Sequence, residues 1–190
     1  APPDAGIPFD RSGVLAVPAD RMRLSDRTLS VAAWVKLDAV DADQVFLNQG
    51  DAGGNFTFYL FGDRVRMLVR HNAESYTHAN VAAPVAGGWT HYLGTYDGAV
   101  IRLYVDGQLA ASTEAAGSIH GGAGGLFVGS LDDYQRMLQG RMTDIRIWNR
   151  TLDADQAAAV WAGRRGGSLD DALLAHWTLD SVSGAGLASL

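Results

Sequence analysis

WTHYLGTYDGAVIRLYVDG, residues 89–107, contains two runs of aromatic and β-branched residues that meet at Asp97-Gly98. A second turn sequence, Asp106-Gly107, ends the stretch. Aromatic and β-branched residues favour strands, and Asp-Gly between two such runs is typical of a β-hairpin. The stretch therefore predicts a β-meander, in which consecutive strands are joined by tight turns.

Alternation of apolar and polar residues continues on the N-terminal side of this meander. Residues 28–37, TLSVAAWVKL, predict a central strand with one apolar face and one mixed face. Residues 55–61 and 64–71 are separated by Gly62-Asp63, a two-residue connection of the type II′ kind, and predict a hairpin. The apolar face of the central strand consists of Leu29, Val31, Ala33, Val35 and Leu37.

Further strands are predicted wherever short apolar runs alternate with turn residues. Strands at this spacing favour a two-sheet sandwich over a parallel sheet that alternates with helices. One short helix is predicted after Asp153, which forms a capping-box pattern with Gln156, and Gly163 ends this helix. The further strands are residues 13–17, 44–49, 75–81, 109–113, 125–130, 137–149 and 173–180.

The composition of the 190-residue chain excludes several classes of protein. Its 15 basic and 21 acidic residues give a net charge of −6, which offers no basic surface to nucleic acid or to an anionic membrane. The absence of cysteine excludes disulfides, thiolate metal sites and cysteine nucleophiles. No apolar run reaches the length of about 20 residues that membrane insertion requires. We expect a single domain over residues 1–190, with its core between about residues 9 and 180.

Residues 140–163, GRMTDIRIWNRTLDADQAAAVWAG, place a strand, a cap and the short helix in succession, and LLAHWTLD closes the chain with another strand. With the meander, these segments resemble the laminin-G-like or pentraxin-like branch of the concanavalin A-like lectin/glucanase superfamily, from Phe9 to about Asp180. The resemblance implies an all-β fold, a two-sheet antiparallel jelly-roll sandwich with one short helix near the C-terminus. That fold carries lectins, adhesion modules, glycosidases and lyases alike.

The motifs of enzymes with this fold are missing. Glycoside hydrolysis uses a pair of carboxylates across the scissile bond, but the two glutamates, Glu74 and Glu114, lie in separate predicted turns. Related lyases use a Gln, His, Arg and Tyr set, whose nearest echo here is Ser118-Ile119-His120. Neither a G-x-S-x-G elbow nor an H-E-x-x-H metal motif occurs. We therefore expect a non-catalytic protein. A hydrolase or lyase that uses aspartates in place of the usual groups remains the enzymatic alternative.

Aspartate-rich turns predict calcium, which takes roughly six to eight oxygen ligands from carboxylates and loop carbonyls. The resemblance implies a structural site where the two chain ends meet and a second site on the rim. The structural site consists of Asp10, Gly50, Asp51 and Asp180. The rim site consists of Asp132 and Asp133, beside Asn55. Solvated acidic turns are the alternative interpretation of these aspartates.

Sugar binding requires aromatic rings for the apolar face of a pyranose and a few convergent polar groups. Suitable side chains alternate outward on neighbouring predicted strands and continue into the loop around residue 134. The predicted ligand-binding residues are Asn55, Arg66, His71, Tyr76, His78, Asp133, Tyr134 and Arg136. The five tryptophans fall within strand or helix patterns and are interpreted as core, and His91 and His176 are interpreted as histidines satisfied within the sheets.

These features predict a secreted or cell-surface recognition module that binds a glycan or glycoprotein with the help of calcium. The alternative from a different class is a structural or adhesion domain that docks onto other domains of a larger protein. The fold resemblance and the missing catalytic pairs favour the recognition module.

Overall fold

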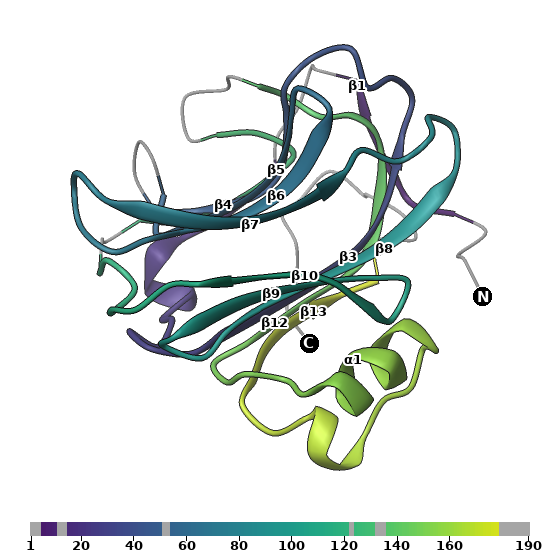
Figure 1. Ribbon diagram of the computed structural model, residues 1–190. Helices are drawn as coiled ribbons and strands as arrows, with labels where there is room; N and C mark the ends of the chain where they lie inside the picture. Colours follow the sequence, from purple (N-terminus) through teal and green to yellow (C-terminus); the bar gives the residue numbers. More distant parts are fainter. Residues whose placement is uncertain (1–4, 11–14, 51–53, 122–123, 132–135, 179–190) are drawn as a thin grey trace.

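Two antiparallel sheets, stacked face to face, form the body of the structure (Figure 1). The computed structural model describes residues 5–10, 15–50, 54–121, 124–131 and 136–178. Within these residues the predicted jelly-roll sandwich is confirmed, with one α-helix towards the C-terminal end of the chain.

Sheet A contains the predicted meander, β8 to β10. Its strand β12 is paired along the same edge by both terminal strands, so that Ile7 of β1 lies opposite Met142 and Trp177 of β13 lies opposite Ile145. In spatial order, sheet A consists of β1 (Ile7–Asp10), β12 (Gln139–Trp148), β3 (Leu29–Leu37), β8 (Trp89–Tyr96), β9 (Val100–Val105) and β10 (Gln108–Glu114), with β13 (Leu173–Trp177) also on β12.

Sheet B contains the predicted hairpin, β5 and β6. Each strand predicted from alternation is present in the described part of the chain, with ends shifted by at most a few residues. The four residues of β1 were not predicted, because so short a run carries no clear alternation. In spatial order, sheet B consists of β2 (Leu15–Val17), β11 (Leu126–Val128), β4 (Gln44–Gln49), β5 (Phe56–Phe61), β6 (Arg64–Arg70) and β7 (Tyr76–Ala82).

The predicted turns adopt the backbone conformations that their residues favour. Asp106 and Gly107 have φ values of 48° and 78°, and positive φ at both central residues is the pattern of a type I′ turn. Gly62, with φ of 58°, is the one central residue of its turn with positive φ, as type II′ requires. In the turn after β8, the Asp97 carboxylate accepts a hydrogen bond from the backbone N–H of Val100 at 2.7 Å.

Aromatic rings from both sheets meet at the centre of the sandwich. Phe46 and Phe58 of sheet B lie with their ring centroids 6.0 Å and 5.8 Å from that of Tyr92 in sheet A. All three side chains are buried, and such aromatic pairs contribute about 0.5–1.5 kcal/mol beyond the burial of area. The apolar face predicted for β3 turns inward to the same core.

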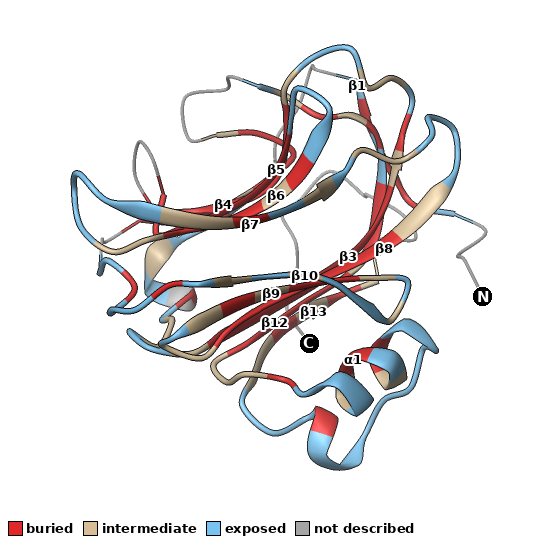
Figure 2. Cartoon of the chain, in the orientation of Figure 1, coloured by how far each residue is buried: buried red, intermediate tan, exposed pale blue. Residues whose placement is uncertain are grey.

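Helix α1 (Ala154–Trp161) covers the outer face of sheet A (Figures 1 and 2). Its capping box is formed as predicted, because the Asp153 carboxylate accepts from the backbone N–H of Gln156 at 2.9 Å. Val160 packs in a cluster with Trp148 of β12. Trp161, predicted as core, is instead 38% exposed. Among the described residues, no helix has the length and apolarity needed to cross a membrane.

The predicted role of His91 as a satisfied histidine is wrong. Its side chain is buried, with its ring edge-on to Trp34 at a centroid distance of 5.3 Å. Neither ring nitrogen has a hydrogen-bond partner in the described part of the chain. Burial lowers the pKa of His91 to about 4, and the nearby Asp144 carboxylate only partly opposes this shift. His176 is satisfied, because its Nε2 donates to Oδ1 of Asp144 at 2.6 Å.

We expect the free energy of unfolding to decrease as the pH falls from about 6.5 to about 4, because His91 takes up a proton more readily in the unfolded chain. Its contribution is on the order of 3 kcal/mol. His91→Phe keeps a buried ring and removes the titration. Urea denaturation near pH 7 and near pH 4.5 should therefore show a smaller difference in this variant than in the wild type.

His120→Phe is the control for that measurement, because His120 is an exposed histidine. This variant should keep the pH dependence of the wild type. An unchanged pH dependence in His91→Phe would contradict the assignment of the acid sensitivity to the buried ring.

Candidate functional site

The two outer faces of the sandwich differ in what covers them. Helix α1 packs on sheet A, on the side away from sheet B, whereas no helix among the described residues lies on the outer face of sheet B (Figure 1). Successive side chains of a strand point to opposite faces, so every second residue of β5, β6 and β7 points to this outer side. Of these side chains, Tyr59 and Leu68 are buried in a small cluster beside Leu131, whereas Phe61 and Tyr76 remain exposed.

Two groups of aromatic and cationic side chains, here together named the outer-face patch, lie on this side of sheet B, with on the order of 20 Å of strand between Phe61 and Tyr76. In one half of it, the guanidinium carbons of Arg66 and Arg136 lie 4.5 Å and 5.6 Å from the ring centroid of Phe61, in cation–π arrangements. In the other half, the rings of Tyr76 and His78 stack with centroids 6.4 Å apart. The outer-face patch consists of Phe61, Arg66, Tyr76, His78 and Arg136.

The outer-face patch combines accessible rings with positive charge. Tyr76 is 54% exposed and Phe61 is 37% exposed, which is more than is usual for large aromatic side chains. Burial lowers the pKa of His78, and the charge of Arg66 lowers it further, so His78 is neutral near pH 7. A neutral imidazole has one donor and one acceptor nitrogen.

Four members of the patch are among the residues predicted from sequence, namely Arg66, Tyr76, His78 and Arg136. The structure places these four on one face, with Arg66 and Arg136 at Phe61 and with Tyr76 stacked on His78. Phe61 was missed, because residues 55–61 were interpreted only as a strand. Two features of the sequence could have identified it. Phe61 lies two residues after Tyr59, and so on the same face of the strand, and it directly precedes the turn residue Gly62.

His71 does not belong to the patch, which corrects the prediction that it lies beside Arg66. An odd number of positions separates the two residues, so their side chains point to opposite faces. The ring of His71 contacts the Ser118 carbonyl and the Thr77 hydroxyl, each at 3.2 Å. Its ring centroid lies 6.0 Å from that of Tyr96 in sheet A, between the sheets.

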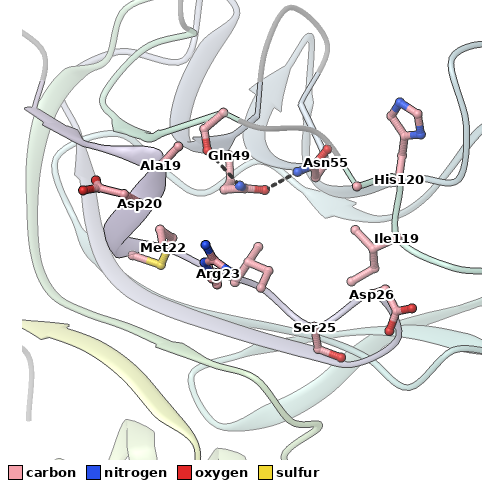
Figure 3. Close-up of a pocket in the computed structure, with 13 residues that line it drawn as sticks. Ala19, Asp20, Met22, Arg23, Ser25, Asp26, Gln49, Asn55, Ile119 and His120 are labelled. Atoms are coloured by element: carbon pink, nitrogen blue, oxygen red, sulfur yellow. Dashed lines mark hydrogen bonds between the residues drawn. The ribbon is translucent and has the colours of Figure 1, made fainter.

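Asn55 lies in a different place, a cavity here named the end pocket, which has a volume of about 470 Å³ at one end of the sandwich. Asn55 and Gln49 are buried and line one wall, where Nδ2 of Asn55 donates to Oε1 of Gln49 at 2.7 Å (Figure 3). Nε2 of Gln49 donates in turn to the carbonyl of Gly124 at 3.0 Å. Met22 and Arg23 face these amides in Figure 3.

The end pocket has a polar lining of mixed charge. Three segments form it: the 3₁₀ helix η1 (Ala19–Arg21) with the residues after it, the ends of the β4–β5 connection, and the segment around His120. Hydrogen bonds join these segments, including one from the backbone N–H of Ile119 to the Asp26 carbonyl at 2.6 Å. The pocket therefore has the size of a small-ligand site but contains no exposed aromatic platform.

The residues predicted to form one structural calcium site do not all meet. Asp10 pairs with Gln139, whose backbone N–H donates to Gln44 at the start of β4, whereas Gly50 follows the opposite end of β4. A six-residue strand, on the order of 20 Å, lies between the two positions, so Asp10 and Gly50 cannot share an ion. Among the described residues, no three His, Cys, Asp or Glu side chains are grouped to hold a metal.

The remaining predicted site residues lie outside the described residues. They are Asp51, Asp132, Asp133, Tyr134 and Asp180.

Comparison with known proteins gives one family and a set of structural relatives. The family model described as "Concanavalin A-like lectin/glucanases superfamily" matches residues 9–158. A search of curated proteins gives no match.

Two solved structures illustrate the structural likeness. A "putative carbohydrate binding protein" from Bacteroides ovatus ATCC 8483 matches with a TM-score of 0.70 and 15% identity, over 95% of this chain and 53% of that chain. The binding domain of botulinum neurotoxin serotype G matches with a TM-score of 0.60 and 12% identity, over 72% of this chain and 36% of that chain. At these identities the likeness shows the fold alone, and this chain spans about half or less of either structure.

We expect Asn55→Ala to lower the free energy of unfolding by about 1–3 kcal/mol, because it removes a buried hydrogen bond and leaves Oε1 of Gln49 without this donor. Urea denaturation measures the change. Asn80→Ala, at an exposed amide on β7, is the control and should stay within about 0.5 kcal/mol of the wild type. Equal losses in both variants would show that the amide pair does not stabilise the end pocket.

Proposed function

Since this chain belongs to the concanavalin A-like lectin/glucanases superfamily, we propose that it is a non-catalytic recognition domain that binds carbohydrate or a glycoconjugate. The lectin-like fold supports the proposal, as does the carbohydrate-binding description of the Bacteroides relative. The two glutamates also support a non-catalytic role, because Glu114 ends β10 of sheet A while Glu74 lies in the β6–β7 turn of sheet B.

The outer-face patch is the observation that carries this proposal. Exposed rings such as Phe61 and Tyr76 stack well on the apolar face of a pyranose. Arg66 and His78 lie beside these rings and offer hydrogen-bonding groups for hydroxyls. A binding surface for sugars needs this combination of apolar platform and convergent polar groups. The end pocket lacks the platform, so we assign the glycan to the patch.

A secreted or cell-surface location is part of the proposal, because extracellular glycans would be met there.

A docking domain of a larger protein is the second candidate. In the two matched structures a domain of this fold is joined to further parts, because this chain spans 53% or less of each. The two candidates differ in whether isolated glycans bind the domain.

On a glycan array, we expect Phe61→Ala and Tyr76→Ala each to weaken binding about tenfold, because each removes one stacking platform. Leu109→Ala is the matched control, since Leu109 is 55% exposed but lies on β10 of sheet A. It should bind like the wild type. Circular dichroism should show the same fold in all three variants. Wild-type protein that binds no glycan would favour the docking domain.

We further propose that calcium stabilises the domain and orders its rim. The support comes from sequence alone: Asp132 and Asp133 are adjacent in a predicted loop, and paired carboxylates of this kind suit Ca²⁺. The same oxygens would supply no chemistry beyond binding, so the role of the ion would be to hold the loop in place.

Calcium should raise the midpoint of thermal unfolding of chelator-treated protein, because an ion bound only by the native state stabilises it by mass action. The gain is about 2.7 kcal/mol at 100 times the dissociation constant. The double variant Asp132→Asn, Asp133→Asn should lose the response, while Asp41→Asn, at an exposed aspartate, should keep it. Identical midpoints with calcium and with chelator would refute calcium binding.

A further inference from the structure

We propose that the outer-face patch selects acidic glycans, with Arg66 binding a carboxylate or sulfate group of a charged sugar. This inference rests on the proposed function, because it names the class of ligand for the same surface. It follows from the state of Arg66, from the packing of its guanidinium, and from the charge of the surrounding surface.

Arg66 lies on this face without a carboxylate partner among the described residues. In the described part of the chain no carboxylate lies within the 4.0 Å that defines an ion pair with it, and its Nε is buried without a hydrogen-bond partner. Its neighbours differ: Arg64 pairs with Asp63 at 3.6 Å, and Arg136 reaches Asp43 at 4.0 Å. A cation without an ionic partner favours a ligand that brings an anionic oxygen to its accessible N–H groups.

The strand pairing holds Arg66 in the middle of the patch. It pairs with Tyr59 on β5 and with Asn80 on β7, and its guanidinium carbon lies 4.5 Å from the ring centroid of Phe61. Stacking on an aromatic ring restricts a guanidinium without using its N–H donors. The planar group can then present two parallel donors to a carboxylate or sulfate, a geometry that lysine lacks.

The charge of Arg66 runs against that of the whole chain. The chain has a net charge of −6, whereas on this face Asp63 and Asp43 lie near Arg64 and Arg136 and no described carboxylate pairs with Arg66. An acidic ligand would therefore be repelled by much of the molecule and attracted to Arg66. Among acidic ligands, a polysaccharide with uronate or sulfate groups fits best, because its ring faces also suit Phe61 and Tyr76.

The test compares matched polymers that differ in charge. Polygalacturonate is compared with its fully methyl-esterified form, and dextran sulfate with dextran, by isothermal titration calorimetry against the whole chain. The two pairs separate a carboxylate ligand from a sulfate ligand. We expect at least one acidic polymer to bind at least about tenfold more tightly than its neutral counterpart, with an affinity that falls as salt is added.

Two variants that each remove one positive charge test whether Arg66 itself binds the acidic polymer. Arg66→Gln should weaken binding of the acidic polymer at least about tenfold, whereas Arg165→Gln, at an exposed arginine near the end of α1, should change it less than about twofold. Arg66→Lys should bind with intermediate affinity, because it keeps the charge and loses the planar fork. Thermal unfolding of each variant confirms that the fold is retained.

Two results would overturn the inference. Equal effects of Arg66→Gln and Arg165→Gln would show that net charge, and not Arg66, attracts the polymer. Neutral polymers that bind as tightly as acidic ones, in a manner that depends on Phe61 and Tyr76, would refute acidic selectivity while leaving the proposed carbohydrate recognition intact. If neither kind of polymer and no arrayed glycan bound, both the inference and the proposed function would fall.

Discussion

Phe46, Phe58 and Tyr92 meet between the two sheets, and their packing holds one face of each strand inward. Side chains of a strand alternate strictly, so this inward burial also determines which residues must face outward. On β6, burial of Val65 and Met67 leaves Arg66 on the other side. The composition of the outer-face patch is thus tied to the core, because a slip of one residue in register would exchange the two faces.

The two outer faces of the sandwich differ in what lies on them. On sheet A, a capped helix buries Trp148 and Leu93, although Trp161 at the end of this helix is 38% exposed. On sheet B, aromatic side chains beside arginines stay at the surface, although burial of their apolar area would stabilise the fold. A domain that needed only stability would gain by covering both faces. The structural argument for recognition at sheet B is that its exposed rings lie beside arginine and histidine side chains.

Local signals predicted the elements well, whereas the site depended on relations between distant residues. The strand Gln44–Gln49 and the cap at Asp153 follow from alternation and from capping, which act within a few residues. The prediction placed His71 on the wrong face, because it did not continue the alternation of side chains along β6 past the end of the strand. The grouping of Asp10 with Gly50 failed because only the pairing of β1 with β12, and the direction of β4, reveal the distance between them.

The shared edge of β12 has a further consequence. Ile7 at the start of β1 and Trp177 at the end of β13 lie opposite positions only three residues apart on one strand, so the polypeptide arrives and departs at neighbouring points. A domain whose two ends lie close together can be inserted into a surface loop of another protein without separating the two sides of that loop. Mechanical tension applied through such a pair of tethers would strip β1 and β13 from their common partner first, one pairing at a time, before it reached the aromatic centre.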